Sequence, residues 1–281
     1  MIVAYSRAEL AAGLKSLRAG SGRLGFVPTM GYLHEGHLSL LDVANQRSDA
    51  VAVSVFVNPF QFGPTEDLGS YPRDTDRDLA LLEKRGADLV FLPEVSEMYA
   101  SGDPRVMADP GPIGSRLCGA YRPGHFRGVL TVVAKLFGLI QPELAVFGRK
   151  DFQQLVLIKH MVRDLEFEVE IVGAPIVREK DGLAMSSRNA YLSAEERQEA
   201  PALHRGLAAT VARFRTGERG AGALLETLRE QFAGLPLLRL QYAEVVDRAS
   251  LDDVDPVLPG SVLAIAAFCG GTRLIDNATM E

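Results

Sequence analysis

Residues 50–57 read AVAVSVFV, a nearly continuous apolar run in which every second residue is valine. A short run of this kind, rich in β-branched side chains and without polar alternation, is typical of a strand buried on both faces of a parallel sheet. An amphipathic helix is predicted at 74–85, and a second buried strand, DLVFL, follows at 88–92. A strand, a helix and another strand in this order predict a parallel βαβ unit.

The same alternation continues on both sides of this unit. Further strands are predicted at 24–27, 144–147 and 169–172, and helices at 6–17, 38–45, 128–140 and 151–165. Five strands that alternate with helices predict an α/β fold, a Rossmann-like doubly wound parallel sheet over residues 1–176. Such sheets bind their ligands at the carboxyl ends of the strands, so a site is expected in the loops after residues 27, 57, 92 and 147.

A different pattern begins after residue 176. One long helix is predicted at 193–215 and another at 222–232, followed by strands at 238–246, 262–268 and 272–276. Helices grouped together and then strands grouped together are typical of a smaller α+β domain. The length of 281 residues agrees with two domains, since a domain has roughly 150 residues. We therefore predict a second domain at 177–281.

Composition and charge argue against several classes of protein. Thirty Lys and Arg against 36 Asp and Glu give a net charge of −6, which does not favour nucleic acid or an anionic membrane as a partner. The two cysteines are far apart, the first residues show no signal-peptide pattern, and no uncharged apolar run reaches the ~18 residues that a membrane span needs. We therefore expect a cytoplasmic protein with reduced thiols.

The glycine pattern GSGRLG at 20–25 matches a dinucleotide-binding fingerprint by letter only. That fingerprint follows a strand and opens a helix, whereas this segment follows a predicted helix and opens a predicted strand. We therefore do not predict a dinucleotide site there.

The loop PTMGYLHEGH at 28–37 follows a predicted strand and leads into a helix. His34 and His37 are three residues apart and so share one face of the helix N-terminus. That N-terminus supplies N–H groups and partial positive charge for a phosphate, Gly31 and Gly36 allow close approach, and two imidazoles can donate to developing charge. A zinc site, which would need further ligands at suitable spacing, and a structural histidine pair are the alternatives.

Four more loops carry polar side chains at strand ends or at the predicted domain junction. The segment NPFQFGP at 58–64 suits a small polar substrate, and FGRKDFQQ at 147–154 places Lys150 for a phosphate chain. The segment LAMSSRN at 183–189 suits a mobile clamp over phosphates. For 58–64 and for YRPGHFRG at 121–128, an ordinary surface turn is the alternative. Together the loops indicate an enzyme that uses ATP.

Five motifs occur in one chain: PTMGYLHEGHLSLL at 28–41, NPFQFG at 58–63, RPGHFRGV at 122–129, GRKDFQQL at 148–155 and GLAMSSRNAYL at 182–192. On these motifs the chain resembles the pantoate–β-alanine ligase family over essentially its whole length. That family belongs to the nucleotidylyltransferase superfamily. The resemblance equates the His34/His37 pair with the HIGH-type signature and residues 185–188 with a KMSKS-like loop.

The resemblance implies a two-step reaction with ATP. The carboxylate of (R)-pantoate attacks the α-phosphate of Mg-ATP, pyrophosphate leaves, and a pantoyl-adenylate stays bound. The amine of β-alanine then attacks the activated carbonyl, which gives pantothenate and AMP. Because an acyl-adenylate must be protected from water, the second domain is expected to act as a lid.

The resemblance also implies roles for individual residues. The catalytic set is His37, His34, Lys150, Ser186, Ser187 and Arg188, with His37 as a proton donor and Lys150 on the phosphates. The ATP site is formed by Thr29, Met30, Gly31, Tyr32, Leu33, His34, Glu35, Gly36, His37, Gly148, Arg149, Lys150, Asp151, Val177, Met185, Ser186, Ser187 and Arg188. Pantoate and β-alanine are bound by Gln61, Gln154, Asn58 and Arg122, and Asp78 resembles a position associated with Mg²⁺.

Several alternatives stay open at this point. Arg149 stands where some relatives carry an acid, so it either adds affinity for phosphate or points to solvent. Within the negative net charge we expect a local cluster of Arg122, Lys150, Arg188 and Arg149 for the triphosphate. A homodimer is implied by the resemblance alone. The rival functions are a sister nucleotidylyltransferase that releases only pyrophosphate and a nucleotide-binding module without turnover.

Overall fold

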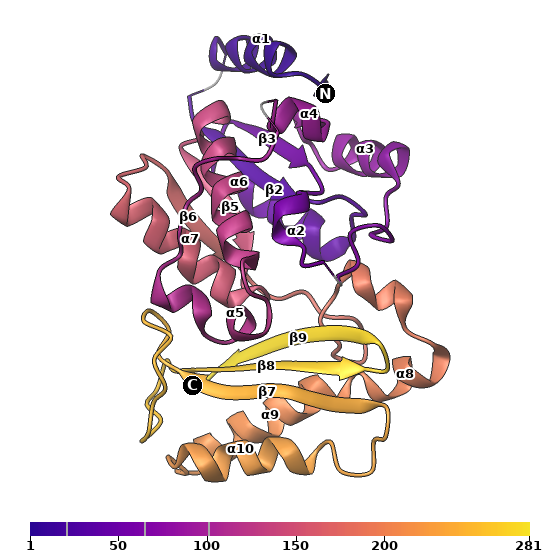
Figure 1. Ribbon diagram of the computed structural model, residues 1–281, viewed down its shortest axis with the longest axis vertical. Helices are drawn as coiled ribbons and strands as arrows, with labels where there is room; N and C mark the ends of the chain where they lie inside the picture. Colours follow the sequence, from indigo (N-terminus) through magenta and orange to yellow (C-terminus); the bar gives the residue numbers. More distant parts are fainter. Residues whose placement is uncertain (21, 65, 101) are drawn as a thin grey trace. The chain divides into compact units, whose positions relative to one another are not determined.

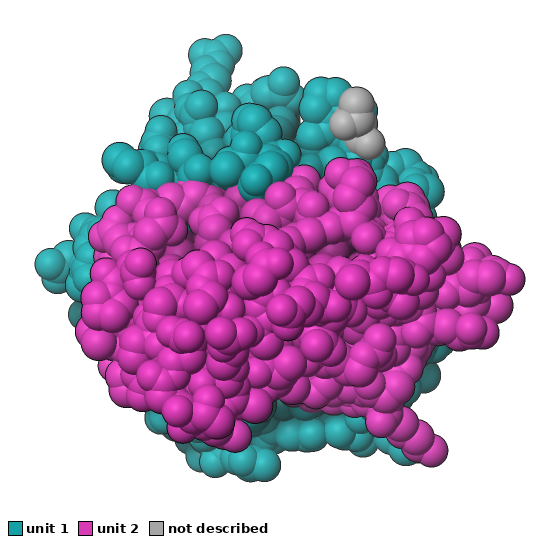
Figure 2. Space-filling model, turned by 90° about the horizontal axis from the view of Figure 1, so that it is seen from below, with its two compact units in different colours: residues 1–115, 119–149, 157–175 teal, residues 116–118, 150–156, 176–281 magenta. Residues whose placement is uncertain are grey.

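The computed structural model describes residues 1–20, 22–64, 66–100 and 102–281. These residues form two compact units, which Figure 2 colours separately. Unit 1 consists of residues 1–115, 119–149 and 157–175, and unit 2 of residues 116–118, 150–156 and 176–281. None of the helices in these ranges is long and apolar enough to span a membrane. The domain boundary at 176/177 and the lid role of the second domain stay predictions.

Unit 1 is built on a six-stranded parallel sheet. Its strands are β1 (Ile2–Ala4), β2 (Leu24–Thr29), β3 (Ala50–Val55), β4 (Leu89–Phe91), β5 (Leu144–Gly148) and β6 (Glu170–Ala174). They lie in the order β1-β4-β3-β2-β5-β6, and all neighbours are parallel. The chain runs from β2 to β3 on one side and later returns to β5 on the other, so the strand order switches between β2 and β5. Doubly wound sheets bind ligands at the carboxyl ends of the strands at such a point, and the predicted α/β fold is confirmed.

Helices cover both faces of this sheet (Figure 1). Val27 of β2 belongs to one buried cluster with Leu41 of α2, whereas its neighbour Phe26 meets Phe137 of α6 edge to face. Because successive side chains of a strand point to opposite faces, α2 and α6 lie on opposite sides of the sheet. The helical elements up to residue 164 are α1 (Arg7–Arg18), α2 (Glu35–Asn45), η1 (Pro59–Gln61), α3 (Thr75–Lys84), α4 (Val95–Met98), η2 (Pro112–Ser115), α5 (Cys118–Tyr121), α6 (His125–Ile140) and α7 (Phe152–Asp164).

The edge strand β1 is absent from the sequence prediction, which has five strands. It is three residues long and pairs with β4, with Ile2 opposite Leu89, and is too short to show an alternating pattern. Helix α2 begins three residues before its predicted start because the His34 side chain caps it. The glycine-rich segment at 20–25 connects α1 to β2, and Ser21 within it lies outside the described residues.

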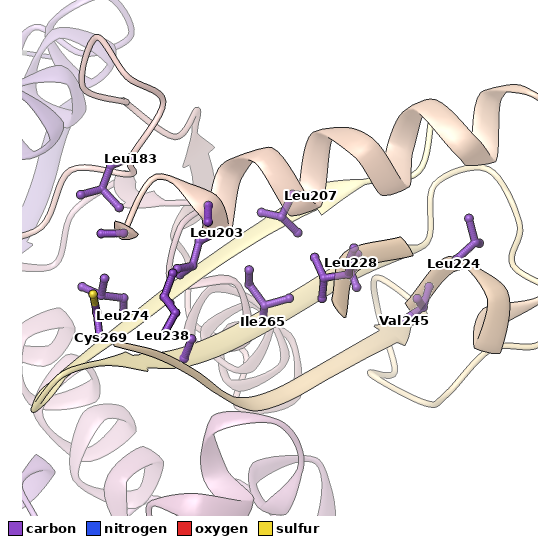
Figure 3. Packing of buried hydrophobic residues seen from close by; sticks show 14 of the residues in the cluster. Leu183, Leu203, Leu207, Leu224, Leu228, Leu238, Val245, Ile265, Cys269 and Leu274 are labelled. Atoms are coloured by element: carbon purple, nitrogen blue, oxygen red, sulfur yellow. The ribbon is translucent and has the colours of Figure 1, made fainter. Parts of the chain in front are cut away.

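Unit 2 combines helices with a three-stranded antiparallel sheet, in which β8 lies between β7 and β9 (Figure 1). Its elements are η3 (Ser187–Tyr191), α8 (Ala194–Glu199), α9 (Ala202–Arg215), α10 (Ala221–Glu230), β7 (Leu238–Val246), β8 (Val262–Cys269) and β9 (Thr272–Thr279). Figure 3 shows the core, where Leu207 of α9 and Leu228 of α10 pack with Ile265 of β8. The smaller α+β unit expected from the sequence is present.

The helix predicted at 193–215 is in fact two helices, so this prediction is wrong. Helix α8 ends at Glu199 and α9 begins at Ala202. Pro201 stands between them; it has no backbone N–H to continue the hydrogen bonds of the preceding helix, but its fixed φ suits the start of a new one. The apolar spacing remains intact in α9, where Leu203 and Leu207 are buried.

Candidate active site

His34 and His37 lie at the N-terminus of α2, just beyond the carboxyl end of β2. His34 Nδ1 accepts a hydrogen bond from Gly36 N–H at 3.1 Å, and His37 Nδ1 accepts one from His34 N–H at 3.4 Å. The two ring centroids are 4.0 Å apart. In a neutral imidazole whose Nδ1 accepts, the hydrogen is on Nε2. Each Nε2–H is therefore a donor, held where the helix dipole favours an anion.

Asp78, the position associated with Mg²⁺, is buried in the first turn of α3. Its Oδ2 accepts Tyr32 N–H at 2.7 Å and its Oδ1 accepts Leu33 N–H at 2.8 Å. Burial raises the pKa of Asp78, and the two N–H donors oppose that shift. No three His, Cys, Asp or Glu side chains are grouped to hold a metal, as far as the chain is described. Because Mg²⁺ requires an octahedral shell of oxygens, this buried carboxylate does not fit a metal site.

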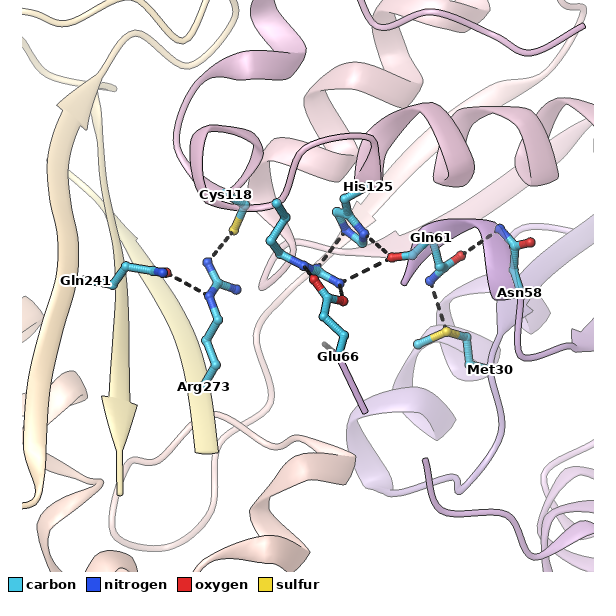
Figure 4. A network of polar contacts seen from close by, with 9 residues as sticks. Met30, Asn58, Gln61, Glu66, Cys118, His125, Gln241 and Arg273 are labelled. Carbon is cyan, nitrogen blue, oxygen red and sulfur yellow. Dashed lines mark hydrogen bonds and ion pairs between the residues drawn. The ribbon is translucent and has the colours of Figure 1, made fainter. Parts of the chain in front are cut away.

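Gln61 lies at the end of η1, beside Met30 (Figure 4). Gln61 Nε2 donates to Met30 Sδ at 3.0 Å, and Gln61 Oε1 accepts from Asn58 Nδ2 at 3.2 Å. Asn58 is buried, and it also donates to the Gly128 carbonyl at 3.1 Å and accepts from the Tyr99 hydroxyl at 2.9 Å. The amide of Asn58 is thus used within the protein, where it orients Gln61 rather than facing a ligand.

Arg122, expected at the substrate, is bound by protein groups. Its Nε donates to Glu66 Oε1 at 2.8 Å, and its side chain and that of Glu66 are 15% and 24% exposed. Burial alone would raise the pKa of Glu66, but the hydrogen bond and charge of Arg122 lower it. Arg122 also meets His125 Nε2 at 2.9 Å, and His125 Nδ1 contacts the Gln61 carbonyl at 2.7 Å. Because a guanidinium only donates, Nε2 accepts and Nδ1–H donates to Gln61.

The loop after β5 begins with Gly148 and Arg149. Arg149 N–H donates to the Ala174 carbonyl at 2.9 Å, and its Nε donates to the Gly173 carbonyl at 3.0 Å. The side chain is exposed and lies along the edge strand β6. These contacts account for an arginine at this position without a phosphate.

Unit 2 contains the second group of predicted site residues. The Lys150 carbonyl accepts from Asn277 Nδ2 of β9 at 3.0 Å, which fixes the turn before α7. Burial lowers the pKa of Lys150; the carboxylates of Asp151 and Asp276 oppose this shift and the cation Arg188 adds to it. The pKa of Lys150 is therefore set mainly by its burial.

Two neighbouring glutamines of α7 have different surroundings. Gln153 is buried, and its Nε2 donates to the Arg116 carbonyl at 2.7 Å. Gln154, which the resemblance assigns to pantoate, is half-buried. Gln153 is thus a structural residue, and Gln154 is the one to test for substrate binding.

The clamp segment, residues 183–189, is held from several sides within unit 2. Met185 N–H donates to the Val177 carbonyl at 3.0 Å, which places these two predicted nucleotide contacts side by side. The Ser186 hydroxyl accepts from Arg188 N–H at 3.3 Å and caps η3, whose first residue, Ser187, is buried. The hydroxyl of Ser186 therefore shapes the turn that presents Arg188.

Charged residues without any motif signal anchor this segment. Glu179 accepts from Asn189 Nδ2 at 2.7 Å and pairs with Arg197 of α8 at 2.6 Å. Arg178 pairs with Asp276 of β9 at 2.6 Å, and the Asp276 side chain is 1% exposed. Sequence reasoning missed these residues because no motif links them to their partners, which lie 10 to 98 positions away and meet only in the fold.

A pair of imidazole donors at a helix N-terminus, at the switch point of a doubly wound sheet, is typical of a nucleotide-binding α/β enzyme. A family model described as pantoate-beta-alanine ligase matches residues 3–279. The chain therefore belongs to the pantoate–β-alanine ligase family.

Known proteins are similar to this chain over nearly their full length. The pantothenate synthetase of Thermoanaerobacter sp. (strain X514) is 51% identical over 277 residues, which cover 99% of this chain and 98% of that protein. The crystal structure of pantothenate synthetase from Thermus thermophilus has a TM-score of 0.93 and 46% identity, and covers 100% of this chain and 99% of its own. The pantoate-beta-alanine ligase from Francisella tularensis, complexed with beta-gamma ATP and beta-alanine, has a TM-score of 0.81 and 32% identity, with coverage of 100% and 98%.

Proposed function

We propose that this chain catalyses the ATP-dependent condensation of (R)-pantoate with β-alanine in two steps. In the first, the pantoate carboxylate attacks the α-phosphorus of ATP, and the bond to pyrophosphate breaks. In the second, the amine of β-alanine attacks the acyl carbon of the pantoyl-adenylate, AMP leaves, and the nitrogen loses a proton as the amide forms. Family membership and the full-length similarity to named ligases support this reaction.

The observation that carries the proposal is the pair of imidazole donors at the start of α2. Negative charge grows on the departing pyrophosphate during the first step. The Nε2–H groups of His34 and His37 are held in place through the backbone partners of Nδ1, and so need little rearrangement to donate to that charge. His37 is proposed to supply the proton. The loop residues Thr29, Met30, Gly31, Tyr32, Leu33, Glu35 and Gly36 would then surround the nucleotide.

The cations of unit 2 are proposed to bind the phosphate chain. Lys150 and Arg188 interact through their charges, and a triphosphate would favour the protonated form of Lys150. Ser186 and Ser187 form the turn at Arg188, and the Val177 and Met185 backbones would flank the base. Gly148, Arg149 and Asp151 complete the proposed ATP site as chain neighbours of Lys150.

Pantoate is proposed to bind through the side-chain amides of Gln61 and Gln154. Asn58 and Arg122 are then supports of Gln61, given their contacts to protein atoms. Magnesium is proposed to arrive with ATP as part of the substrate, since Asp78 does not fit a metal site. The homodimer and the cytoplasmic location stay predictions.

The decisive experiment is exchange of labelled pyrophosphate into ATP. We expect exchange that requires pantoate and proceeds without β-alanine; addition of β-alanine should give AMP and the amide in equal amounts. His37→Ala should slow exchange by roughly 100-fold, because one preorganised donor is lost. His160→Ala, which removes a ring that contacts Arg163 on α7, should leave it unchanged.

Two other outcomes would contradict the proposal. Exchange that does not need pantoate, with no AMP formed, would indicate a sister nucleotidylyltransferase. ATP binding without any exchange would indicate a nucleotide-binding module.

A further inference from the structure

Two successive N–H groups of the loop after β2 point at one carboxylate. Tyr32 N–H donates to Asp78 Oδ2 at 2.7 Å, and Leu33 N–H donates to Asp78 Oδ1 at 2.8 Å. Asp78 belongs to α3, a helix that follows this loop only after β3, and the exposed fraction of the residue is 2%. A buried carboxylate whose two oxygens each accept a loop N–H is well placed to fix that loop.

The loop has a backbone conformation that needs such support. Gly31 has φ +84° and Tyr32 has φ +49°, so two consecutive residues are left-handed. A non-glycine residue persists there only where its surroundings hold it. A Cβ at position 31 would lie 3.0 Å from Asp78 Oδ2 and 3.0 Å from Val55 Cγ1, so the turn is closed over the carboxylate and only glycine fits.

The consequence for the site follows along the chain. Leu33 is 1% exposed and immediately precedes His34, the N-cap of α2. Asp78 holds the Leu33 N–H, the Leu33 side chain is held in the core, and the next residue carries the first imidazole. A shift of this loop would therefore move the His34 ring and, through the His34 N–H bond to Nδ1, the His37 ring.

We propose that Asp78 is a positioning residue that locks residues 31–33 and thereby aims the His34 and His37 donors, and that it does not bind metal. The effect on catalysis rests on the proposed function, in which these rings face the phosphates. The lock itself is a property of the protein without ligands, so the two can be tested separately.

The test compares Asp78→Asn with Asp76→Asn, an exposed carboxylate in the same first turn of α3. Asparagine keeps the volume but turns an NH₂ group toward a backbone N–H. We expect kcat for pantoate-dependent pyrophosphate exchange to fall by roughly 100-fold, as a misplaced catalytic group would cause, with a much smaller change in the KM for ATP. Asp76→Asn should match the parent enzyme.

Magnesium titration separates a positioning residue from a metal ligand. If Asp78 locks the loop, the Mg²⁺ concentration for half-maximal exchange is the same in Asp78→Asn and in the parent, and excess Mg²⁺ restores nothing. Recovery of activity at high Mg²⁺ would show that Asp78 is a metal ligand and overturn the proposal.

Hydrogen exchange provides a test that does not depend on activity, and its measurement on the unmutated protein does not depend on folding of the variant. In EDTA and without ATP, the amides of Tyr32 and Leu33 should be strongly protected, and in a folded Asp78→Asn variant that protection should be lost while β7–β9 remain protected. Fast exchange of both amides in the unmutated protein would refute the lock. If the two amides are protected but the unmutated protein shows no pantoate-dependent exchange of pyrophosphate into ATP, only the proposed function is refuted.

Discussion

Gln61 is oriented by neighbouring side chains. Asn58 and Met30 contact its side-chain amide, and His125 contacts its backbone carbonyl. Arg122, which is paired with Glu66, in turn contacts His125. Because the Gln61 side chain is already oriented, it would lose little conformational freedom when substrate binds. Its hydrogen bond to the substrate would then contribute to affinity and to alignment.

Gln61→Ala should raise the KM for pantoate by roughly tenfold, since about 1.4 kcal/mol of hydrogen bonding is lost, and should leave the KM for ATP almost unchanged. Steady-state kinetics with each substrate varied in turn measure both values. Gln46→Ala is the matched control, because Gln46 is an exposed glutamine at the end of α2. A defect confined to ATP would remove Gln61 from the pantoate site.

The lowered pKa of Lys150 leads us to expect that ATP binding weakens at alkaline pH. The ammonium form of Lys150 is proposed to bind phosphate. Burial lowers the pKa of Lys150, so as pH rises it loses its charge earlier than an ordinary lysine does. The KM for ATP should therefore increase from neutral to alkaline pH. Lys150→Arg should flatten this increase, because a guanidinium keeps its proton throughout. The same pH slope in both proteins would exclude Lys150 as its source.

For individual residues, the sequence predicts those features that depend only on nearby positions in the chain. The spacing of His34 and His37 and their place between a strand and a helix are sufficient to predict a shared face. The partners of Asn58, Arg122 and Asp78 could not be predicted, because Tyr99, Glu66 and the Tyr32 N–H group reach them only through tertiary structure. Polar residues in a motif therefore include both ligands and supports, and the motif alone does not separate them.

Among the elements, prediction succeeded where a buried run was long enough to show its period. β3 and α6 appear within a few residues of their expected bounds. β1 was missed because three residues carry no period, and the break at Pro201 was missed because the apolar spacing continues across it. Asn277 was placed outside β9, which in fact continues to Thr279.

β9 supplies two buried polar residues that join separate parts of unit 2. Asp276 pairs with Arg178 at the base of the clamp segment, and Asn277 holds the Lys150 carbonyl. Burying these polar groups would be unfavourable without their partners. Their contacts therefore indicate that they fix the clamp segment and the turn at Lys150. The pair and the hydrogen bond lie on neighbouring residues, so a shift of β9 would disturb both.

Asp276→Asn should lower the free energy of unfolding by roughly 3 kcal/mol, because it leaves the mostly buried Arg178 without a counter-charge. Urea unfolding followed by circular dichroism measures the change. Glu226→Gln removes an exposed partner of Arg229 on α10 and should give no measurable change. Equal stability of the two variants would show that the buried pair contributes nothing.

In the whole molecule, the net charge of −6 does not indicate which Lys and Arg side chains are already bound by other protein groups. Of the four cations expected around the triphosphate, Arg122 is paired with Glu66, and Arg149 donates to carbonyls of β6. Lys150 and Arg188 are the two whose charges act on each other. The sum over the sequence could not predict which arginines are already paired.

The two units are interleaved along the chain, which predicts how a fragment behaves. Residues 177–281 alone lack segments 116–118 and 150–156 of unit 2. They would lose the contact between Cys118 Sγ and the buried Tyr242 hydroxyl and the acceptor of Asn277. We expect this fragment to unfold at low urea with poor cooperativity and to give a poorly dispersed amide spectrum. A sharp transition and a dispersed spectrum would instead establish 176/177 as a true domain boundary.

The position of β9 in the chain has a consequence during synthesis. The turn at Lys150 and the clamp segment emerge from the ribosome well before residues 276 and 277, which hold them. Domains tend to fold from the N-terminus as they emerge, so unit 1 can form its sheet first. A nascent chain halted between residues 189 and 272 therefore has its histidine pair and its clamp segment but lacks Asp276 and Asn277, which hold Arg178 and the Lys150 carbonyl.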